Sequence, residues 1–252
     1  MSNIYLFDVD GTLTHAKQKI DSQFAKQFLA WMKHKEVYIV SGGSFVRIIN
    51  QLGLDITEHC SGVFACMGNI FYQKIDNINE TGYSEWEIVY ENKFQAPRGL
   101  YRDLDSLVQT SQYHTKTGLH YEERVGMVNF SVVGRNATLE QRDEYSEYDQ
   151  AEKEREEIVS LLKSRYTTLD FAIGGAVSID IFNTGNDKSQ VIDRYFSEAI
   201  ENNKIVFFGD RIPFPGNDYP LASVLDEYSN GQSIKVNCWE DTRDMLLTSE
   251  FA

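Results

Sequence analysis

Cysteine, proline and positive charge are scarce in this sequence, and long apolar runs are absent from it. The 252 residues include 3 cysteines and 4 prolines, and 24 lysines and arginines stand against 38 aspartates and glutamates, a net charge of −14. Nucleic acids and anionic membrane surfaces select basic patches, so an acidic chain matches neither. No apolar stretch approaches the roughly 18 residues that span a bilayer. We therefore expect neither a nucleic-acid partner nor a membrane partner.

The cysteines Cys60, Cys66 and Cys238 form no CxxC pair. An odd and sparse set of thiols fits a reducing compartment better than a disulfide framework. The first residues run directly into an apolar segment without a basic leader or a cleavage-site pattern. Together these features predict a cytoplasmic protein.

The first fifty residues alternate between short β-prone segments and amphipathic helical ones. Apolar residues recur at helical spacing in the helical segments, and Asp21 or Ser22 can serve as the first N-cap. This βαβα pattern favours a parallel sheet with right-handed crossovers. The expected strands are 4–7 and 37–40, and the expected helices are 21–35 and 45–52.

The alternation is lost between residues 82 and 186. We expect strands at 86–90 and 127–133 and a long charged helix at 141–166, which together predict an inserted α+β domain with antiparallel pairing. The charged run 152–157 is most simply a solvated helix face without chemistry.

The parallel pattern resumes after the insertion. The predicted division is a core domain in two parts, 1–81 and 187–252, around an inserted cap domain, 82–186. The second part of the core is expected to contain helices at 191–200 and 241–247 and strands at 204–208 and 233–236.

Polar loops follow three of the apolar strands. Asp8 and Asp10 follow the first strand, Ser41 the second, and Asp210 the strand at 204–208. The carboxyl ends of parallel strands form the binding crevice of an open sheet. Carboxylates gathered there need a cation, and oxygen ligands suit Mg²⁺ together with a phosphate. These loops therefore predict a metal site and a phosphorylated substrate.

Ser41, Gly42 and Gly43 are suited to hold a phosphate, since the hydroxyl donates and glycines permit close backbone approach at a helix N-terminus. Lys188 can neutralise the remaining phosphate charge. A calcium loop starting at Asp8 is excluded, because Leu13 and Lys19 occupy the positions that require glycine and glutamate.

In this order the motifs resemble those of the haloacid dehalogenase superfamily. The resemblance narrows to eukaryotic-type phosphomannomutases through the segment after the first motif and through the insert. The residues that carry it are Asp8–Thr14, Ser41–Gly43, Lys188, Gly209–Asp210 and Asn217–Asp218 for the superfamily, and 16–21, 123–131, 134–142, 174–180 and 215–218 for the family.

The resemblance implies a Rossmann-like α/β core with a parallel sheet and an inserted α+β cap. It implies that Asp8 is the nucleophile that accepts the phosphoryl group and that Asp10 is the general acid and base. Asp8, the Asp10 backbone carbonyl and Asp210 would hold Mg²⁺, with Asn217 and Asp218 shaping its surroundings. Ser41 and Lys188 complete the expected catalytic set.

The resemblance also implies the substrate ligands. A mutase must hold one phosphate at the nucleophile and the other across the cleft, and arginine forks bind such a phosphate directionally. The expected ligands are Arg124, Arg135 and Arg142 for phosphate, Ser178 and Asp180 for the sugar, and Lys17, Gly42 and Gly43 on the core.

Three positions depart from the family pattern. Lys17 stands where an arginine is usual, which keeps the charge and loses the fork. Cys66-Met67-Gly68 replaces a more polar Glu-Asn-Gly, and Asp210 replaces an asparagine common in relatives. The added charge of Asp210 is expected to tighten metal binding.

The expected activity is interconversion of mannose 6-phosphate and mannose 1-phosphate through an aspartyl-phosphate enzyme, with a hexose 1,6-bisphosphate as intermediate and activator. Two alternatives stay open: a Mg²⁺-dependent sugar-phosphate phosphatase, and a non-catalytic sugar-phosphate sensor. By resemblance we also expect a homodimer that forms through the cap.

Overall fold

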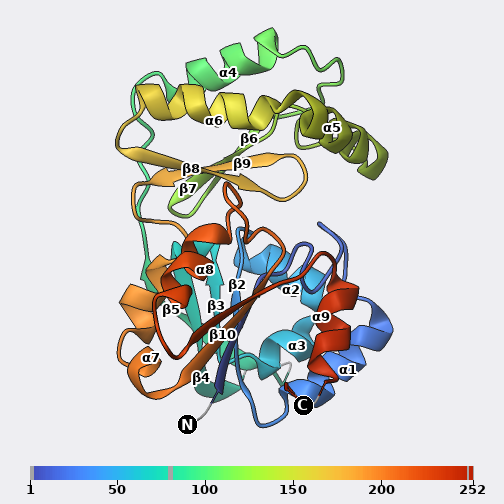
Figure 1. Ribbon diagram of the computed structural model, residues 1–252, viewed down its shortest axis with the longest axis vertical. Helices are drawn as coiled ribbons and strands as arrows, with labels where there is room; N and C mark the ends of the chain where they lie inside the picture. The colour runs from blue at the N-terminus through green and yellow to red at the C-terminus, as the bar shows by residue number, and fades with distance from the viewer. Residues whose placement is uncertain (1–2, 79–81, 249, 252) are drawn as a thin grey trace.

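A seven-stranded sheet forms the centre of the larger of two layered units (Figure 1). The computed structural model describes residues 3–78, 82–248 and 250–251. The strand order is β11-β10-β1-β2-β3-β4-β5, with the first five strands parallel and β4 and β5 antiparallel. The strands are β1 (Asn3–Phe7), β2 (Glu36–Val40), β3 (Gly62–Ala65), β4 (Ile70–Ile78), β5 (Ser84–Glu91), β10 (Lys204–Gly209) and β11 (Gly231–Lys235).

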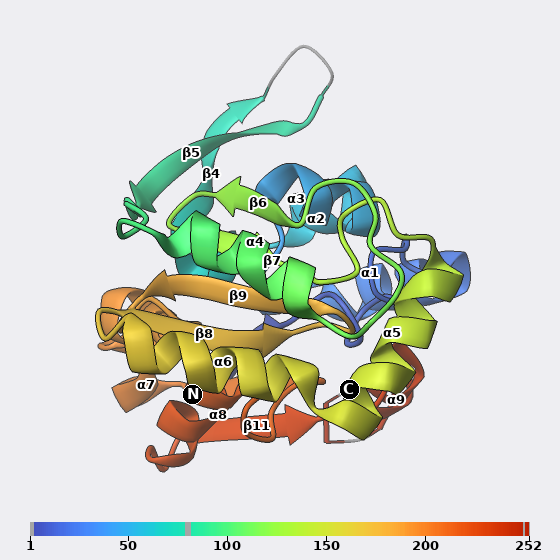
Figure 2. The same cartoon turned by 90° about the horizontal axis from the view of Figure 1, so that it is seen from above.

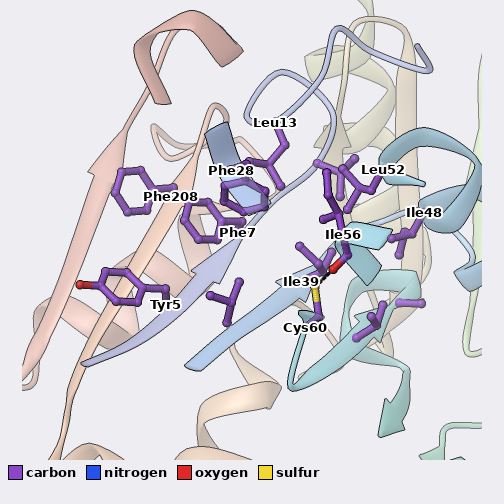
Figure 3. Packing of buried hydrophobic residues seen from close by; sticks show 14 of the residues in the cluster. Tyr5, Phe7, Leu13, Phe28, Ile39, Ile48, Leu52, Ile56, Cys60 and Phe208 are labelled. Carbon is purple, nitrogen blue, oxygen red and sulfur yellow. Dashed lines mark hydrogen bonds between the residues drawn. The ribbon is translucent and has the colours of Figure 1, made fainter. Parts of the chain in front are cut away.

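Helices cover both faces of this sheet, which is why its central strands are apolar on both sides. Phe7 of β1 stacks on Phe208 of β10 at a centroid distance of 4.9 Å and meets Phe28 of the first helix edge-on (Figure 3). Asp21 caps that helix by accepting from two backbone N–H groups, as predicted. One face carries α1 (Ser22–Met32), α2 (Phe45–Leu52), α3 (Leu54–His59) and α9 (Trp239–Leu246), and the other carries a π-helical turn (Ile192–Phe196), α7 (Ala199–Asn202) and α8 (Tyr219–Asp226).

A second, four-stranded antiparallel sheet lies over the carboxyl ends of the parallel strands (Figure 1). Helices cover the side of this sheet that faces away from the core, and Figure 2 shows them from above. We call this unit the cap. Its strand order is β6-β7-β9-β8, and its elements are β6 (Tyr121–Arg124), β7 (Met127–Phe130), β8 (Leu169–Gly174), β9 (Ser178–Asn183), α4 (Leu100–Thr110), α5 (Leu139–Glu152) and α6 (Glu154–Arg165).

The strand expected to open the inserted domain lies in the core instead. Segment 86–90 forms part of β5, which pairs with β4 at the edge of the seven-stranded sheet. The chain therefore leaves the core after Glu91, later than the predicted boundary at residue 82. The sequence does not reveal this, because an amphipathic strand has the same pattern in either sheet.

The charged stretch 141–166 forms two helices instead of one. Lys153 adopts a left-handed conformation with φ 60°, and the chain turns there between α5 and α6. Arg155, expected on a solvated face, is only 5% exposed, and its Nε donates to Asp149 Oδ2 at 2.8 Å. Its Nη1 donates to the carbonyls of Gly175 and Ser178. The solvated-face prediction is therefore wrong for Arg155, which holds the β8–β9 hairpin to α6.

The predicted helix at 191–200 forms as the π-helical turn followed by α7. A 3₁₀ turn, η1 (Cys66–Gly68), connects β3 to β4. No helix in the described part of the chain is long and apolar enough to cross a membrane.

Candidate functional site

Three parallel strands bring their polar loops to one edge of the core sheet, beneath the cap (Figure 1). Asp8 follows β1, Ser41 follows β2 and Asp210 follows β10. The β1–β10 register continues past the strand end, since the Asp8 amide donates to the Phe208 carbonyl at 3.0 Å. The sheet edge therefore places these three residues side by side, as expected for an open parallel sheet.

Asp8, Asp210 and Asp218 form an acidic cluster around one buried lysine. One carboxylate oxygen from each aspartate lies within 4.8 Å of the others. Lys188 Nζ donates to Asp8 Oδ1 and to Asp218 Oδ1, both at 2.6 Å, and its side chain is fully buried. Arg211, which is partly exposed, pairs with Asp210 at 3.3 Å.

The cations do not fully offset the charge of the cluster. Burial raises the pKa of Asp8 well above its ordinary value, with repulsion from Asp218 and Asp210 adding to it against the attraction of Lys188. Burial and the Asp218 charge likewise raise the pKa of Asp210 to about 7. Both shifts indicate a site that stabilises a further cation.

The donor set fits a hard divalent ion such as Mg²⁺, which takes carboxylate oxygens. A Cβ built on Gly11 would lie 2.5 Å from Asp210 Oδ2, and Gly11 has φ +89°. Only glycine therefore lets the first loop approach the cluster this closely. Asp218 belongs to the cluster, although the resemblance gave it a role only in the surroundings.

The Asp10 carboxylate is not a member of the cluster and is held by three groups. Its Oδ1 accepts from the Lys17 amide at 2.7 Å and from Gln51 Nε2 at 2.8 Å, and its Oδ2 accepts from Arg47. Burial raises the pKa of Asp10, but the Arg47 charge and these hydrogen bonds outweigh it, so the pKa lies below its usual value. Asp10 is therefore ionised at neutral pH and fits the role of a base. Metal binding by its backbone carbonyl stays a prediction.

The Ser41–Gly43 loop lies between the two units. Ser41 is buried, and its Oγ accepts from the Gly43 amide at 3.1 Å. The Gly42 carbonyl accepts from Arg124 Nη1 of the cap at 2.6 Å. This bond ties the cap directly to the predicted phosphate loop, and Arg124 Nε is buried without a partner.

Glu122 joins two of the predicted cap arginines. Arg124 Nη2 donates to Glu122 Oε2 at 2.7 Å, and Arg135 Nη2 pairs with the same oxygen. Burial raises the pKa of Glu122, but the two arginines outweigh it and hold the pKa below its usual value. A carboxylate therefore occupies the arginine pair where the resemblance places a substrate phosphate.

Arg142 and Lys17 approach the same space with few anionic partners. Arg142 is 6% exposed, and its Nη1 has no hydrogen-bond partner. Burial, with repulsion from Arg135 and Arg47, lowers the pKa of Arg142 to about 10. Burial and the charges of Arg142, Arg135 and Arg47 lower the pKa of Lys17 to about 7. Such crowding of cations favours the binding of an anion.

The predicted sugar ligands lie on β9 of the cap. Asp180 is 2% exposed and accepts from Asn129 Nδ2 at 2.6 Å, and Asn129 in turn accepts from Arg135. Burial raises the pKa of Asp180. Ser178 is buried, and Arg155 holds its carbonyl.

Core and cap together line one cleft of about 40 Å³, which has room for only a few water molecules. A hexose phosphate can therefore enter only if the cap moves or the side chains that line the cleft rearrange. Among the predicted residues, those that line it are Asp8, Asp10, Lys17, Ser41, Gly42, Gly43, Arg124, Arg142, Ser178, Asp180 and Asp210. Lys188 does not line the cleft but donates to Asp8, which does, and Arg135 likewise donates to the lining residue Asn129.

Four residues of the site were missed by the sequence analysis: Arg47, Gln51, Glu122 and Asn129. Asn129 was quoted only as part of a motif. Arg47 and Gln51 are four residues apart on α2, which follows the phosphate loop directly, and this spacing puts both on one helix face. That position is the one signal that could have identified them.

The fold is of the haloacid dehalogenase type. Two solved structures share this fold. A haloacid dehalogenase-like hydrolase from Bacteroides thetaiotaomicron has a TM-score of 0.55 and 16% identity, and the match covers 97% of this chain and 92% of that one. A subclass IIB sugar phosphatase has a TM-score of 0.56 and 15% identity, and the match covers 98% of both chains.

Sequence comparison identifies the family. The model described as eukaryotic phosphomannomutase matches residues 25–249. The phosphomannomutase of Solanum lycopersicum is 33% identical over 226 residues, covering 86% of this chain and 84% of the relative. Human phosphomannomutase 1 is 34% identical over 239 residues, covering 91% and 86%. The chain belongs to the eukaryotic phosphomannomutase family.

Proposed function

We propose that this protein interconverts mannose 6-phosphate and mannose 1-phosphate by phosphoryl transfer through Asp8. One observation carries the proposal: the carboxylates of Asp8 and Asp10 line the same narrow cleft as Arg124 and Arg142 of the cap. A nucleophile alone would serve a phosphatase. An arginine cluster facing it across a closed cleft serves an enzyme that must keep the second phosphate bound.

The order of events follows from the side chains. The aspartyl phosphate of Asp8 transfers its phosphoryl group to the free hydroxyl of the hexose monophosphate while Asp10 takes up the hydroxyl proton, and a hexose 1,6-bisphosphate forms. The bisphosphate then turns around, Asp8 attacks its other phosphorus in line, and the sugar oxygen leaves with the proton from Asp10. A hexose 1,6-bisphosphate links the two half-reactions and primes the enzyme.

We assign Mg²⁺ to the cluster of Asp8, Asp210 and Asp218. When bound, the ion would neutralise the negative charge that builds up on the phosphoryl group during its transfer. Lys188 lowers the pKa of Asp8 against the effect of burial and holds its carboxylate in place. Ser41 and the following glycines hold the remaining phosphoryl oxygens.

Water exclusion determines which product forms. Arg124 bonds the cap to the Gly42 carbonyl, which closes the cleft over the nucleophile. An aspartyl phosphate in a closed cleft is protected from hydrolysis and can return its phosphoryl group to a sugar.

Intact-protein mass spectrometry after mixing with glucose 1,6-bisphosphate and Mg²⁺ tests the nucleophile. We expect one phosphoryl group on the parent and on Ser178→Ala, and none on Asp8→Asn. Phosphorylation of Asp8→Asn at the parent level would contradict the assignment.

The proposal also covers the cellular compartment and the oligomeric state. The three cysteines are free thiols, which supports a reducing, cytoplasmic environment. We also propose a homodimer formed through the cap, as the family resemblance implies, and sedimentation of the purified protein tests it.

A further inference from the structure

Arg47 occupies a central place in the cleft. It is the third residue of α2, and its Cδ lies 3.6 Å from where a Cβ on Gly43 would be, so its stem runs along the phosphate loop. Its Nε donates to Gln51 Oε1 at 3.1 Å, and its Nη2 donates to Asp10. No described residue accepts a hydrogen bond from Nη1, and the side chain is 23% exposed.

Arg47 extends the cationic cluster of the cap onto the core. Its charge helps to lower the pKa of Arg142, of Arg135 and of Lys17, after burial, which is the largest cause in each case. Arg47 lines the same cleft as Lys17 and Arg142, which places these charges near one another.

Five cationic side chains thus lie at this part of the cleft, four of them in its lining and Arg135 behind its wall, and two carboxylates pair with them directly: Asp10 with Arg47, and Glu122 with two cap arginines. The excess of positive charge matches a phosphate dianion. The five are Lys17, Arg47, Arg124, Arg135 and Arg142.

We propose that Arg47 is a ligand on the core, beside Lys17, of the substrate phosphate that the cap arginines bind. This inference rests on the proposed function and adds a ligand that neither the motifs nor the resemblance assigns. The phosphate that is not being transferred then contacts both units, so its binding holds the cap against the core. It also takes the place of Asp10 on Arg47 and frees the Asp10 carboxylate to reach the sugar oxygen.

Calorimetric titration with mannose 6-phosphate tests the inference in an Asp8→Asn background, which prevents turnover. We expect Arg47→Gln to raise the Kd at least about tenfold, in line with the loss of a charge-assisted bond. Arg47→Lys should recover part of the affinity, because it keeps the charge and loses the fork. Arg102→Gln removes an arginine whose side chain is 84% exposed and should leave the Kd unchanged.

A double-substitution cycle identifies the shared phosphate. If Arg47 and Arg142 bind one phosphate, combining Arg47→Gln with Arg142→Gln should raise the Kd by less than the product of the single effects. An unchanged Kd in Arg47→Gln, with kcat reduced in the Asp8-containing enzyme, would overturn the inference and make Arg47 a positioning residue for Asp10. Single effects that multiply would overturn it as well, since they would place the two arginines on separate groups.

Inorganic phosphate, titrated into the same variants, separates this inference from the proposed function. A parent that binds inorganic phosphate and fails to bind mannose 6-phosphate would refute the sugar substrate. In that case the effect of Arg47→Gln on the Kd for inorganic phosphate decides the role of Arg47 by itself.

Discussion

Replacing Lys188 by methionine removes a buried cation that contacts two members of the acidic cluster. The ammonium donates to Asp8 and to Asp218 at 2.6 Å, and its side chain is 0% exposed. Breaking a buried pair by removing one partner costs roughly 3–5 kcal/mol, because the remaining charge is left uncompensated. Two carboxylates are left here, so we expect about 5 kcal/mol at pH 8 in metal-free buffer, or a Tm lower by roughly 10–20 °C.

The loss should depend on pH in a defined direction. Without Lys188, the folded-state pKa of Asp8 lies even further above the unfolded value, so the folded protein takes up protons as the pH falls. Stability is then lost as the pH rises through the folded-state pKa, and Lys188→Met should destabilise less at pH 6 than at pH 8.

Thermal and urea unfolding in EDTA measure the effect, with Lys19→Met, which removes an exposed lysine, as the matched control. Combining Lys188→Met with Asp218→Asn should recover part of the stability, because it removes one of the orphaned charges. The reasoning is refuted if Lys188→Met lies within about 0.5 kcal/mol of the control, or if the added Asp218→Asn lowers stability further.

Three more predictions concern the metal and the cap. Mg²⁺ should raise the Tm more at pH 8 than at pH 6, because Asp210, with a pKa of about 7, is protonated at the lower pH and protons then compete with the metal; equal shifts would contradict the assignment. Gly11→Ala should weaken Mg²⁺ binding at least about tenfold in calorimetry, since its Cβ would lie 2.5 Å from Asp210 Oδ2, whereas Gly82→Ala, with a similar φ and open space around it, should not. Glu122→Gln should tighten binding of inorganic phosphate, because it removes the carboxylate that competes for two cap arginines; weaker binding would mean that Glu122 is needed to orient them.

Most of the site residues that lie on the core could be predicted, because they directly follow the ends of strands. Asp8, Ser41 and Asp210 each follow an apolar segment, and the parallel pattern alone requires that these ends meet. The fold class was confirmed for the same reason. The placement of β5 was not predictable, because the pairing partner of an amphipathic strand depends on contacts far along the chain.

The internal pairing of the charged groups could not be deduced from spacing. Lys188 was expected to neutralise phosphate, and the structure adds its bonds to Asp8 and Asp218, residues that are 180 and 30 positions away. The run of charges predicted a solvated Arg155, yet its side chain is buried and donates to Asp149 and to two carbonyls of the β8–β9 hairpin. In both cases a buried partner decides where the charge lies.

The measurement that tests the central claim most directly is ³¹P NMR of the protein with Mg²⁺, mannose 1-phosphate and a trace of glucose 1,6-bisphosphate. Mannose 6-phosphate and inorganic phosphate are followed in the same tube. The account predicts that mannose 6-phosphate forms in large excess over inorganic phosphate, and that Asp8→Asn abolishes both products. Inorganic phosphate as the main product would show that the cap admits water and that the enzyme is a phosphatase, and no product from the parent would contradict catalysis altogether.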